Sequence, residues 1–151
     1  MALRIGTELP SLDGATEWQG GSVERDTLTG SPTLVHFWSV SCYICKNNLP
    51  TLEEWQKTYG PKGLKVVAIH APRAEDETDT ERVKSVREEF GMTEPCAVDN
   101  TFALADRFEI GGLWPHYFLF GNDGKLKSRA AGNAGLTMIG TALKKLLDTP
   151  A

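Results

Sequence analysis

The stretch that decides the fold is Trp38-Ser39-Val40-Ser41-Cys42-Tyr43-Ile44-Cys45. A run that is apolar except for His36, 34–38, leads into it, and a pattern typical of a helix, 46–59, leads out of it. Two cysteines separated by two residues therefore lie where a predicted strand ends and a predicted helix begins.

This position favours thiol chemistry. The first turn of a helix has backbone N–H groups without intrahelical partners, and the helix dipole places partial positive charge there. Both effects stabilise an anion, so we expect Cys42 to ionise readily and to act as a nucleophile. Cys45 follows about one helical turn later, where its sulfur can close a ring with that of Cys42. One thiol can then attack a disulfide while the other resolves the mixed disulfide.

Two other interpretations of the cysteine pair are half of a zinc site and a pair of buried thiols. His70 and His116 would complete a Cys₂His₂ set, but their spacing matches no usual zinc module, and the chain has no second C-x-x-C. We therefore predict no metal site and no built-in cofactor. Cys96 enters a predicted strand, where a third redox thiol is possible in principle and a small buried apolar residue is the interpretation we favour.

Composition narrows the function classes. The 151 residues predict one domain, 1–151, with a net charge of −4 and no cluster of lysine and arginine. Nucleic acid and anionic membranes are accordingly poor partners. Residues 1–12 lack an apolar segment of signal-peptide length, and no stretch is long enough to span a bilayer. The expected protein is a cytoplasmic monomer.

The apolar patterns predict alternating strands and helices, followed by a hairpin and a last helix. The expected strands are 33–40, 65–70, 95–99, 116–120 and 125–131. The expected helices are 46–59, 83–90, 100–108 and 136–147, with capping by Thr78 and Glu81 before the second and by Asn100 at the third. A short helix, 23–28, capped by Ser22, is expected within an N-terminal extension, 1–30. The acidic stretch 71–80 is interpreted as a solvated loop. This order is typical of an α/β fold with a central mixed sheet flanked by helices on both faces.

Three separated motifs carry a resemblance to a known family. They are Phe37-Trp38-Ser39-Val40-Ser41-Cys42-Tyr43-Ile44-Cys45-Lys46 followed by Pro50, then Val98-Asp99 with Leu104-Ala105-Asp106-Arg107-Phe108, and Gly112-Leu113-Trp114-Pro115. Together they resemble the thioredoxin superfamily, and within it the soluble members of the TlpA/ResA branch of thiol–disulfide oxidoreductases. The resemblance covers the chain from about Thr33 to the end.

The resemblance implies a thioredoxin fold with the extension 1–30 packed on its core. It also implies that the protein reduces disulfides of protein substrates, with Cys42 attacking, Cys45 resolving and an unidentified electron donor restoring the dithiol. Pro115 is implied to be cis and to lie against the cysteine pair. The backbone around Trp114 could then pair with an extended substrate.

The sequence departs from these relatives at two positions. Many thioredoxins carry an aspartate six residues before the first cysteine, where this chain has His36, and several branch members carry a glutamate three residues after the second cysteine, where it has Asn48. His36 could accept the proton of Cys45, since histidine titrates near neutral pH, or it could be a hydrogen-bonded core residue. Both interpretations stay open.

An apolar rim is expected around the cysteines, formed by Trp38, Tyr43, Ile44 and Trp114, with Trp38 also contributing to the core. A thiol peroxidase and a zinc-stabilised or redox-gated binding module are the alternative functions. The paired cysteines argue against the first of these, because peroxide chemistry in related folds uses a single peroxidatic thiol in a polar site.

Overall fold

Six strands form one mixed sheet in the computed structural model, which describes residues 3–148. The strands are β1 (Glu17–Gln19), β2 (Thr33–Trp38), β3 (Lys65–His70), β4 (Cys96–Val98), β5 (His116–Phe120) and β6 (Leu126–Ala131). Their order across the sheet is β1-β4-β3-β2-β5-β6. The three central strands β2, β3 and β4 are parallel, and the remaining pairs are antiparallel. The prediction of a central mixed sheet in an α/β fold is confirmed.

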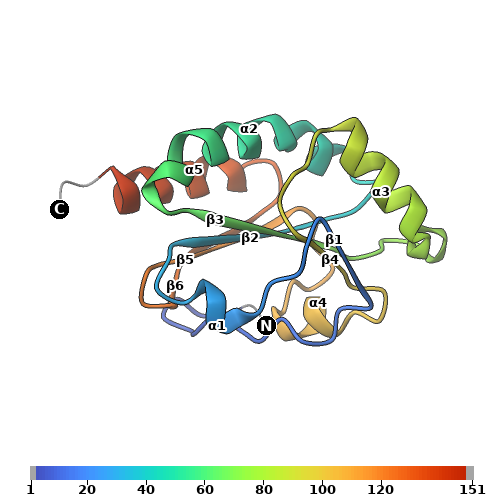
Figure 1. The fold of residues 1–151 in the computed structure, drawn as a ribbon, viewed down its shortest axis with the longest axis horizontal. Helices are drawn as coiled ribbons and strands as arrows, with labels where there is room; N and C mark the ends of the chain where they lie inside the picture. The colour runs from blue at the N-terminus through green and yellow to red at the C-terminus, as the bar shows by residue number, and fades with distance from the viewer. Residues whose placement is uncertain (1–2, 149–151) are drawn as a thin grey trace.

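Helices cover both faces of this sheet (Figure 1). One face carries α2 (Tyr43–Tyr59), α3 (Thr80–Glu89) and α5 (Gly135–Leu147), and the other carries α1 (Arg25–Leu28) and α4 (Ala103–Arg107). Two short 3₁₀ helices, η1 (Gly60–Lys62) and η2 (Glu75–Thr78), follow α2 and β3.

The alternation of side chains along β2 divides the core in two. Phe37 points toward α4 and contacts Phe108 and Phe118, with ring centroids 5.3 and 5.9 Å away in edge-to-face geometry. Leu34 points to the opposite face and packs with α2 and α5. Each such buried side chain contributes about 1.5–3 kcal/mol, so β2 is held from both sides up to the residue where the cysteine loop starts.

The N-terminal extension contacts the face of the sheet that carries α1 and α4. Its apolar residues belong to the core cluster on that face: Leu3, Leu9, Leu12 and Leu28. Its backbone is also bonded to the β5–β6 hairpin, since the Leu9 N–H donates to the Gly124 carbonyl and the Leu126 N–H to the Thr7 carbonyl, both at 2.8 Å. That the whole chain is one domain stays a prediction.

Several predicted helix starts are wrong. Helix α1 begins at Arg25 with Glu24 as its N-cap, so Ser22 plays no part in that cap. Helix α2 begins at Tyr43, because β2 ends at Trp38 and leaves only four residues before the helix. Helix α3 is capped by Asp79, whose Oδ1 accepts the Glu81 N–H at 3.0 Å, while Thr78 ends η2.

Helix α4 differs in the same way. Its N-cap is Phe102, a bulky residue at a left-handed φ of 64°. The preceding Asp99 accepts the N–H groups of Leu104 and Ala105 at 2.9 and 2.7 Å and does the capping predicted for Asn100. The Asn100 amide instead donates to the Thr78 carbonyl at 3.0 Å, which ties this loop to the one after β3.

Candidate active site

The topology brings four loops together at one edge of the sheet, the edge at which the parallel strands end. The parallel strands β2, β3 and β4 end there, followed by residues 39–42, 71–79 and 99–102, and the antiparallel β5 starts there after residues 111–115. The edge beyond the carboxyl ends of parallel strands is where open α/β sheets place their functional groups.

Cys42 and Cys45 lie at this edge and are joined by a disulfide, with their Cα atoms 5.2 Å apart. Cys42 is the N-cap of α2, and its Sγ accepts the Cys45 backbone N–H at 3.1 Å. The first turn of α2 contains no acidic residue. The first sulfur thus occupies the position where the helix N-terminus stabilises a negative charge. The pair is nearly covered, with 3 % of Cys42 and 2 % of Cys45 exposed.

The expected apolar rim divides into exposed and buried residues. Tyr43 is 75 % exposed and Ile44 is 37 % exposed, directly after the first cysteine. Trp38 is buried, belongs to the same apolar cluster as both cysteines, and meets the His70 ring edge-to-face with centroids 5.0 Å apart. Trp114 is half-buried and packs against that cluster, and its peptide bond to Pro115 is cis.

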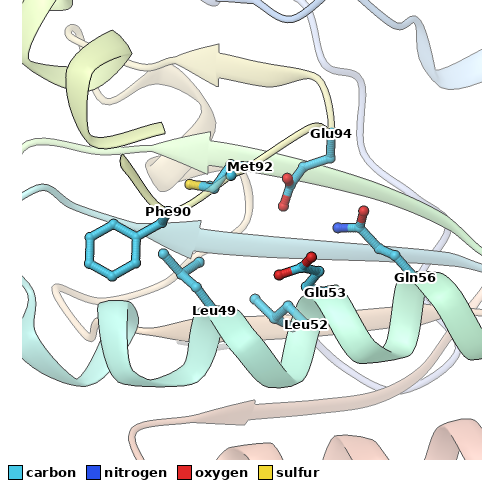
Figure 2. Close-up of a pocket in the computed structure, with 8 residues that line it drawn as sticks. Leu49, Leu52, Glu53, Gln56, Phe90, Met92 and Glu94 are labelled. Atoms are coloured by element: carbon cyan, nitrogen blue, oxygen red, sulfur yellow. The ribbon is translucent and has the colours of Figure 1, made fainter. Parts of the chain in front are cut away.

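His36 is buried and does not face solvent. Its Nε2 lies 2.8 Å from the Glu94 Oε2. Burial raises the pKa of Glu94, but the hydrogen bond and charge interaction with His36 outweigh this effect and leave the pKa below its ordinary value. Figure 2 shows the Glu94 carboxylate pointing into a hollow over α2, which is lined in part by Leu49, Glu53 and Phe90. This contact fits the interpretation of His36 as a hydrogen-bonded core residue.

Asn48 occupies the position where some relatives carry a glutamate, and it is also buried. Its amide donates to the Tyr117 hydroxyl at 2.8 Å. Burial raises the pKa of Tyr117 to about 12, with Asn48 acting in the opposite direction. The pair is therefore neutral at pH 7 and joins α2 to β5.

Glu77 is a residue that the sequence analysis missed. The acidic stretch 71–80 was expected to be a solvated loop, but Glu77 is only 2 % exposed because η2 turns it toward the site. Burial raises its pKa, but hydrogen bonds from Ser41, the Arg73 backbone and Ser39 outweigh burial and hold the pKa below its ordinary value. The sequence offered one signal for Glu77: it follows the carboxyl end of a predicted parallel strand, where functional side chains gather.

His70 and His116 do not gather with the cysteines as a zinc site would require. Side chains alternate along each strand, and His70 lies against Trp38 while His116 stacks on Phe118 in the opposite half of the core. The His70 Nε2 already accepts the Val40 N–H at 3.2 Å. Among residues 3–148, no group of three or more His, Cys, Asp or Glu side chains could hold a metal ion.

Cys96 is fully buried on β4, and burial raises the pKa of its thiol to about 12. The interpretation of this third cysteine as a small buried apolar residue is confirmed. In the described part of the chain, no helix combines the length and apolarity needed to cross a membrane.

Comparison with known proteins agrees with this geometry. A model of the AhpC/TSA family matches residues 5–129. The chain is 37 % identical over 146 residues to the thiol-disulfide oxidoreductase YkuV of Bacillus subtilis, covering 96 % of this chain and 97 % of the relative. It is 29 % identical over 144 residues to the thiol-disulfide oxidoreductase ResA of Bacillus thuringiensis, covering 95 % and 79 %.

The solved structures agree with the sequence relatives. The solution structure of a thioredoxin-like protein in its oxidised form superposes with a TM-score of 0.88 at 37 % identity, covering 97 % of this chain and 98 % of that one. The predicted thioredoxin fold is thereby confirmed. Fold, cysteine geometry and family match lead to one assignment: the chain belongs to the AhpC/TSA family of the thioredoxin superfamily.

Proposed function

We propose that the protein is a thiol–disulfide oxidoreductase that reduces disulfides in polypeptide substrates. The observation that carries this proposal is the Cys42–Cys45 disulfide at the N-terminus of α2, with the Cys42 Sγ bonded to a backbone N–H of that helix. A sulfur held there is stabilised as a thiolate, which is the attacking species in disulfide exchange. Relatives named for the same activity support the proposal.

The reaction has two exchange steps. The Cys42 thiolate attacks one sulfur of the substrate disulfide, that S–S bond breaks, and the first substrate sulfur leaves as a thiolate. Cys45 then loses its proton and attacks the Cys42 sulfur, which releases the second substrate sulfur and forms the Cys42–Cys45 bond. Two electrons pass to the substrate, and a dithiol donor must return two electrons to the protein. The chemical identity of that donor is open.

The residues around the disulfide are assigned to substrate binding. Tyr43 and Ile44 offer exposed apolar surface beside the first sulfur. The backbone at Trp114 and Pro115, which precedes β5, is proposed to pair with an extended substrate segment. Trp38 is assigned to the support of the two cysteines, with which it shares an apolar cluster.

We assign His36 to the support of the site through its bond to Glu94. Its role as proton acceptor for Cys45 stays a prediction. We also propose a cytoplasmic location, since a dithiol couple works as a reductant where the surroundings keep thiols reduced. The proposed state is a monomer that acts on protein substrates and binds neither nucleic acid nor membranes.

A trapping experiment tests the assignment. Cys45→Ser should accumulate a mixed disulfide with a peptide that contains one disulfide, whereas Cys42→Ser should accumulate none, as read by mass spectrometry. Cys96→Ala is the matched control and should reduce the peptide as the wild type does. Equal trapping by both single variants would overturn the assigned roles. Faster turnover of hydrogen peroxide than of the peptide would favour the thiol peroxidase, and stoichiometric zinc in the reduced protein would favour the binding module.

A further inference from the structure

A buried carboxylate lies directly behind the loop that carries the attacking cysteine. Glu77 is 2 % exposed, although its neighbours Glu75 and Asp76 are exposed. Buried carboxylates are rare unless their oxygens are hydrogen-bonded. The partners of Glu77 therefore show what its burial accomplishes.

Both carboxylate oxygens of Glu77 are bonded. Oε2 accepts the Ser41 hydroxyl at 2.7 Å, and Oε1 accepts the Arg73 backbone N–H at 3.2 Å. Ser41 is the residue immediately before Cys42, and its hydroxyl lies 3.4 Å from that of Ser39. The carboxylate is thus connected to the cysteine loop through the side chain next to the attacking sulfur.

The end of β3 holds the rest of that loop. The Ala71 N–H donates to the Trp38 carbonyl at 3.1 Å, and the Val40 N–H donates to the His70 Nε2 at 3.2 Å. Because Nε2 accepts, the proton of the neutral His70 ring is assigned to Nδ1. Burial lowers the pKa of His70 to about 4, against the effect of the Glu77 charge, so His70 is neutral at pH 7.

The ionisable groups that face the loop from this side differ in charge and in exposure to solvent. His70 adds none, and Glu77 adds a buried negative charge. The Arg73 guanidinium lies in solvent, 3.5 Å from the Ser41 carbonyl, and is screened there. Arg82, on α3, contributes a positive charge toward His70, and its side chain is 43 % exposed. The helix N-terminus favours negative charge at Cys42, whereas Glu77, bonded to the residue before Cys42, carries a negative charge itself.

We propose that Glu77 is a positioning residue for Cys42, which holds the loop through Ser41 and, by its charge, makes the Cys42–Cys45 couple more reducing. A charge that destabilises the thiolate destabilises the reduced protein and so favours transfer of electrons to the substrate. The converse is known for strongly oxidising members of this fold, in which the reduced form is stabilised. This inference rests on the proposed function and adds the residue that sets the direction of exchange.

Three variants separate the charge of Glu77 from its hydrogen bond. Glu77→Gln removes the charge, Ser41→Ala removes the hydroxyl donor and leaves the charge in place, and Glu75→Gln removes an exposed neighbouring charge as the matched control. For each variant, the pH midpoint of thiolate formation at Cys42 is first measured by ultraviolet absorbance. The redox equilibrium with reduced and oxidised glutathione is then measured at a pH above that midpoint.

Glu77→Gln should shift this equilibrium about tenfold toward the dithiol, which is a potential about 30 mV higher, and should lower the thiolate midpoint. Ser41→Ala should shift it about threefold toward the disulfide, because the carboxylate loses the donor that offsets its charge. Glu75→Gln should match the wild type.

The amide oxygen of Glu77→Gln can still accept the Ser41 hydroxyl, but as a weaker, uncharged acceptor. A merely structural role predicts that Glu77→Gln and Ser41→Ala, which both weaken this hydrogen bond, move the equilibrium in the same direction, and that result would overturn the proposal. A potential for Glu77→Gln equal to that of Glu75→Gln would also overturn it. If Glu77→Gln does not fold, a shift of Ser41→Ala toward the dithiol refutes the proposal and a shift toward the disulfide supports it. Trapping by Cys45→Ser is unaffected by these outcomes, so failure of the proposed function would be seen separately.

Discussion

Two buried histidine–glutamate sets, whose histidines lie on neighbouring strands, differ in how they use their hydrogen bonds. His36 on β2 and Glu94, in the segment before β4, are bonded to each other at 2.8 Å. His70 at the end of β3 accepts the Val40 N–H, and Glu77 in η2 accepts the Ser41 hydroxyl, so both are bonded to the loop before the cysteines. In the first set the two side chains bond to each other inside the core, whereas in the second set both side chains bond to the loop that carries the reactive sulfur.

The difference teaches that residue types alone do not distinguish a buried pair that stabilises the fold from one that changes the redox properties of the active-site loop. A buried charge bonded mainly to its own partner has its effect on folding, because removing either side leaves the other uncompensated. A buried charge bonded to an active loop acts on the geometry and ionisation of that loop. We therefore expect substitutions in the first set to change stability and substitutions in the second to change redox properties and pH dependence.

The largest expected effect is on stability, at His36. His36→Phe should lower the free energy of unfolding by about 3–5 kcal/mol, because it leaves the Glu94 carboxylate buried without its partner. Urea unfolding of the oxidised protein measures this loss. The double variant with Glu94→Leu should recover most of it, while the redox potential stays that of the wild type. A changed pH dependence of the resolving step would instead restore His36 as the proton acceptor for Cys45.

The next effect is a loss of stability in mild acid. Burial lowers the pKa of His70 to about 4 in the folded protein, from the ordinary value of 6.5 in the unfolded chain, so only the unfolded chain gains the proton between these values. Stability should fall by about 3 kcal/mol from pH 6.5 to 4 on this account. Burial also lowers the pKa of His116, which adds a loss in the same direction.

Glu77 and Glu94 contribute to this fall only near its lower end. The pKa values of Glu77 and Glu94 are lowered, so the stability they contribute is present above 4.5 and is lost only as the pH falls below that value. His70→Gln should therefore show a fall smaller by about 3 kcal/mol in urea titrations between pH 6.5 and 4. A variant with the same slope as the wild type would contradict the assignment to His70.

The smallest effect is expected at the uncharged pair. Asn48→Ala should cost about 1–3 kcal/mol, because it leaves the buried Tyr117 hydroxyl without its donor. The loss should be independent of pH between 5 and 8, because neither Asn48 nor Tyr117 titrates there. Thermal unfolding at several pH values measures both statements. A loss as large as that of His36→Phe would show that charge is not what distinguishes the first set.

Local patterns predicted the parts of the fold that depend on local physics. The bounds of β3 and β5 match the prediction because each contains an uninterrupted apolar run, 66–69 in β3 and 117–120 in β5. The cysteine pair was found because its spacing and its place before a helix are visible in the sequence. Adjacent polar residues such as Asp99 and Asn100 compete for one cap, and only the packed backbone decides between them.

The parts that could not be predicted depend on long-range contacts. Glu94 lies 58 positions after His36, and Glu77 lies 36 positions after Ser41. Among several acidic residues in one stretch, the residue that turns inward is selected by the η2 turn and by donors in a distant loop. Composition averages over such a stretch and favours solvation, which is correct for Glu75 and Asp76 and wrong for Glu77.

The short strand β1 has a consequence for how the protein behaves in a crowded solution. It pairs with β4 over only three residues and places the charged Glu17 at the outer border of the sheet. A long, flat, apolar border recruits strands from other chains and seeds aggregates, whereas a brief and charged border does not. The β1 border of the sheet therefore offers little backbone with which a strand of another chain could pair.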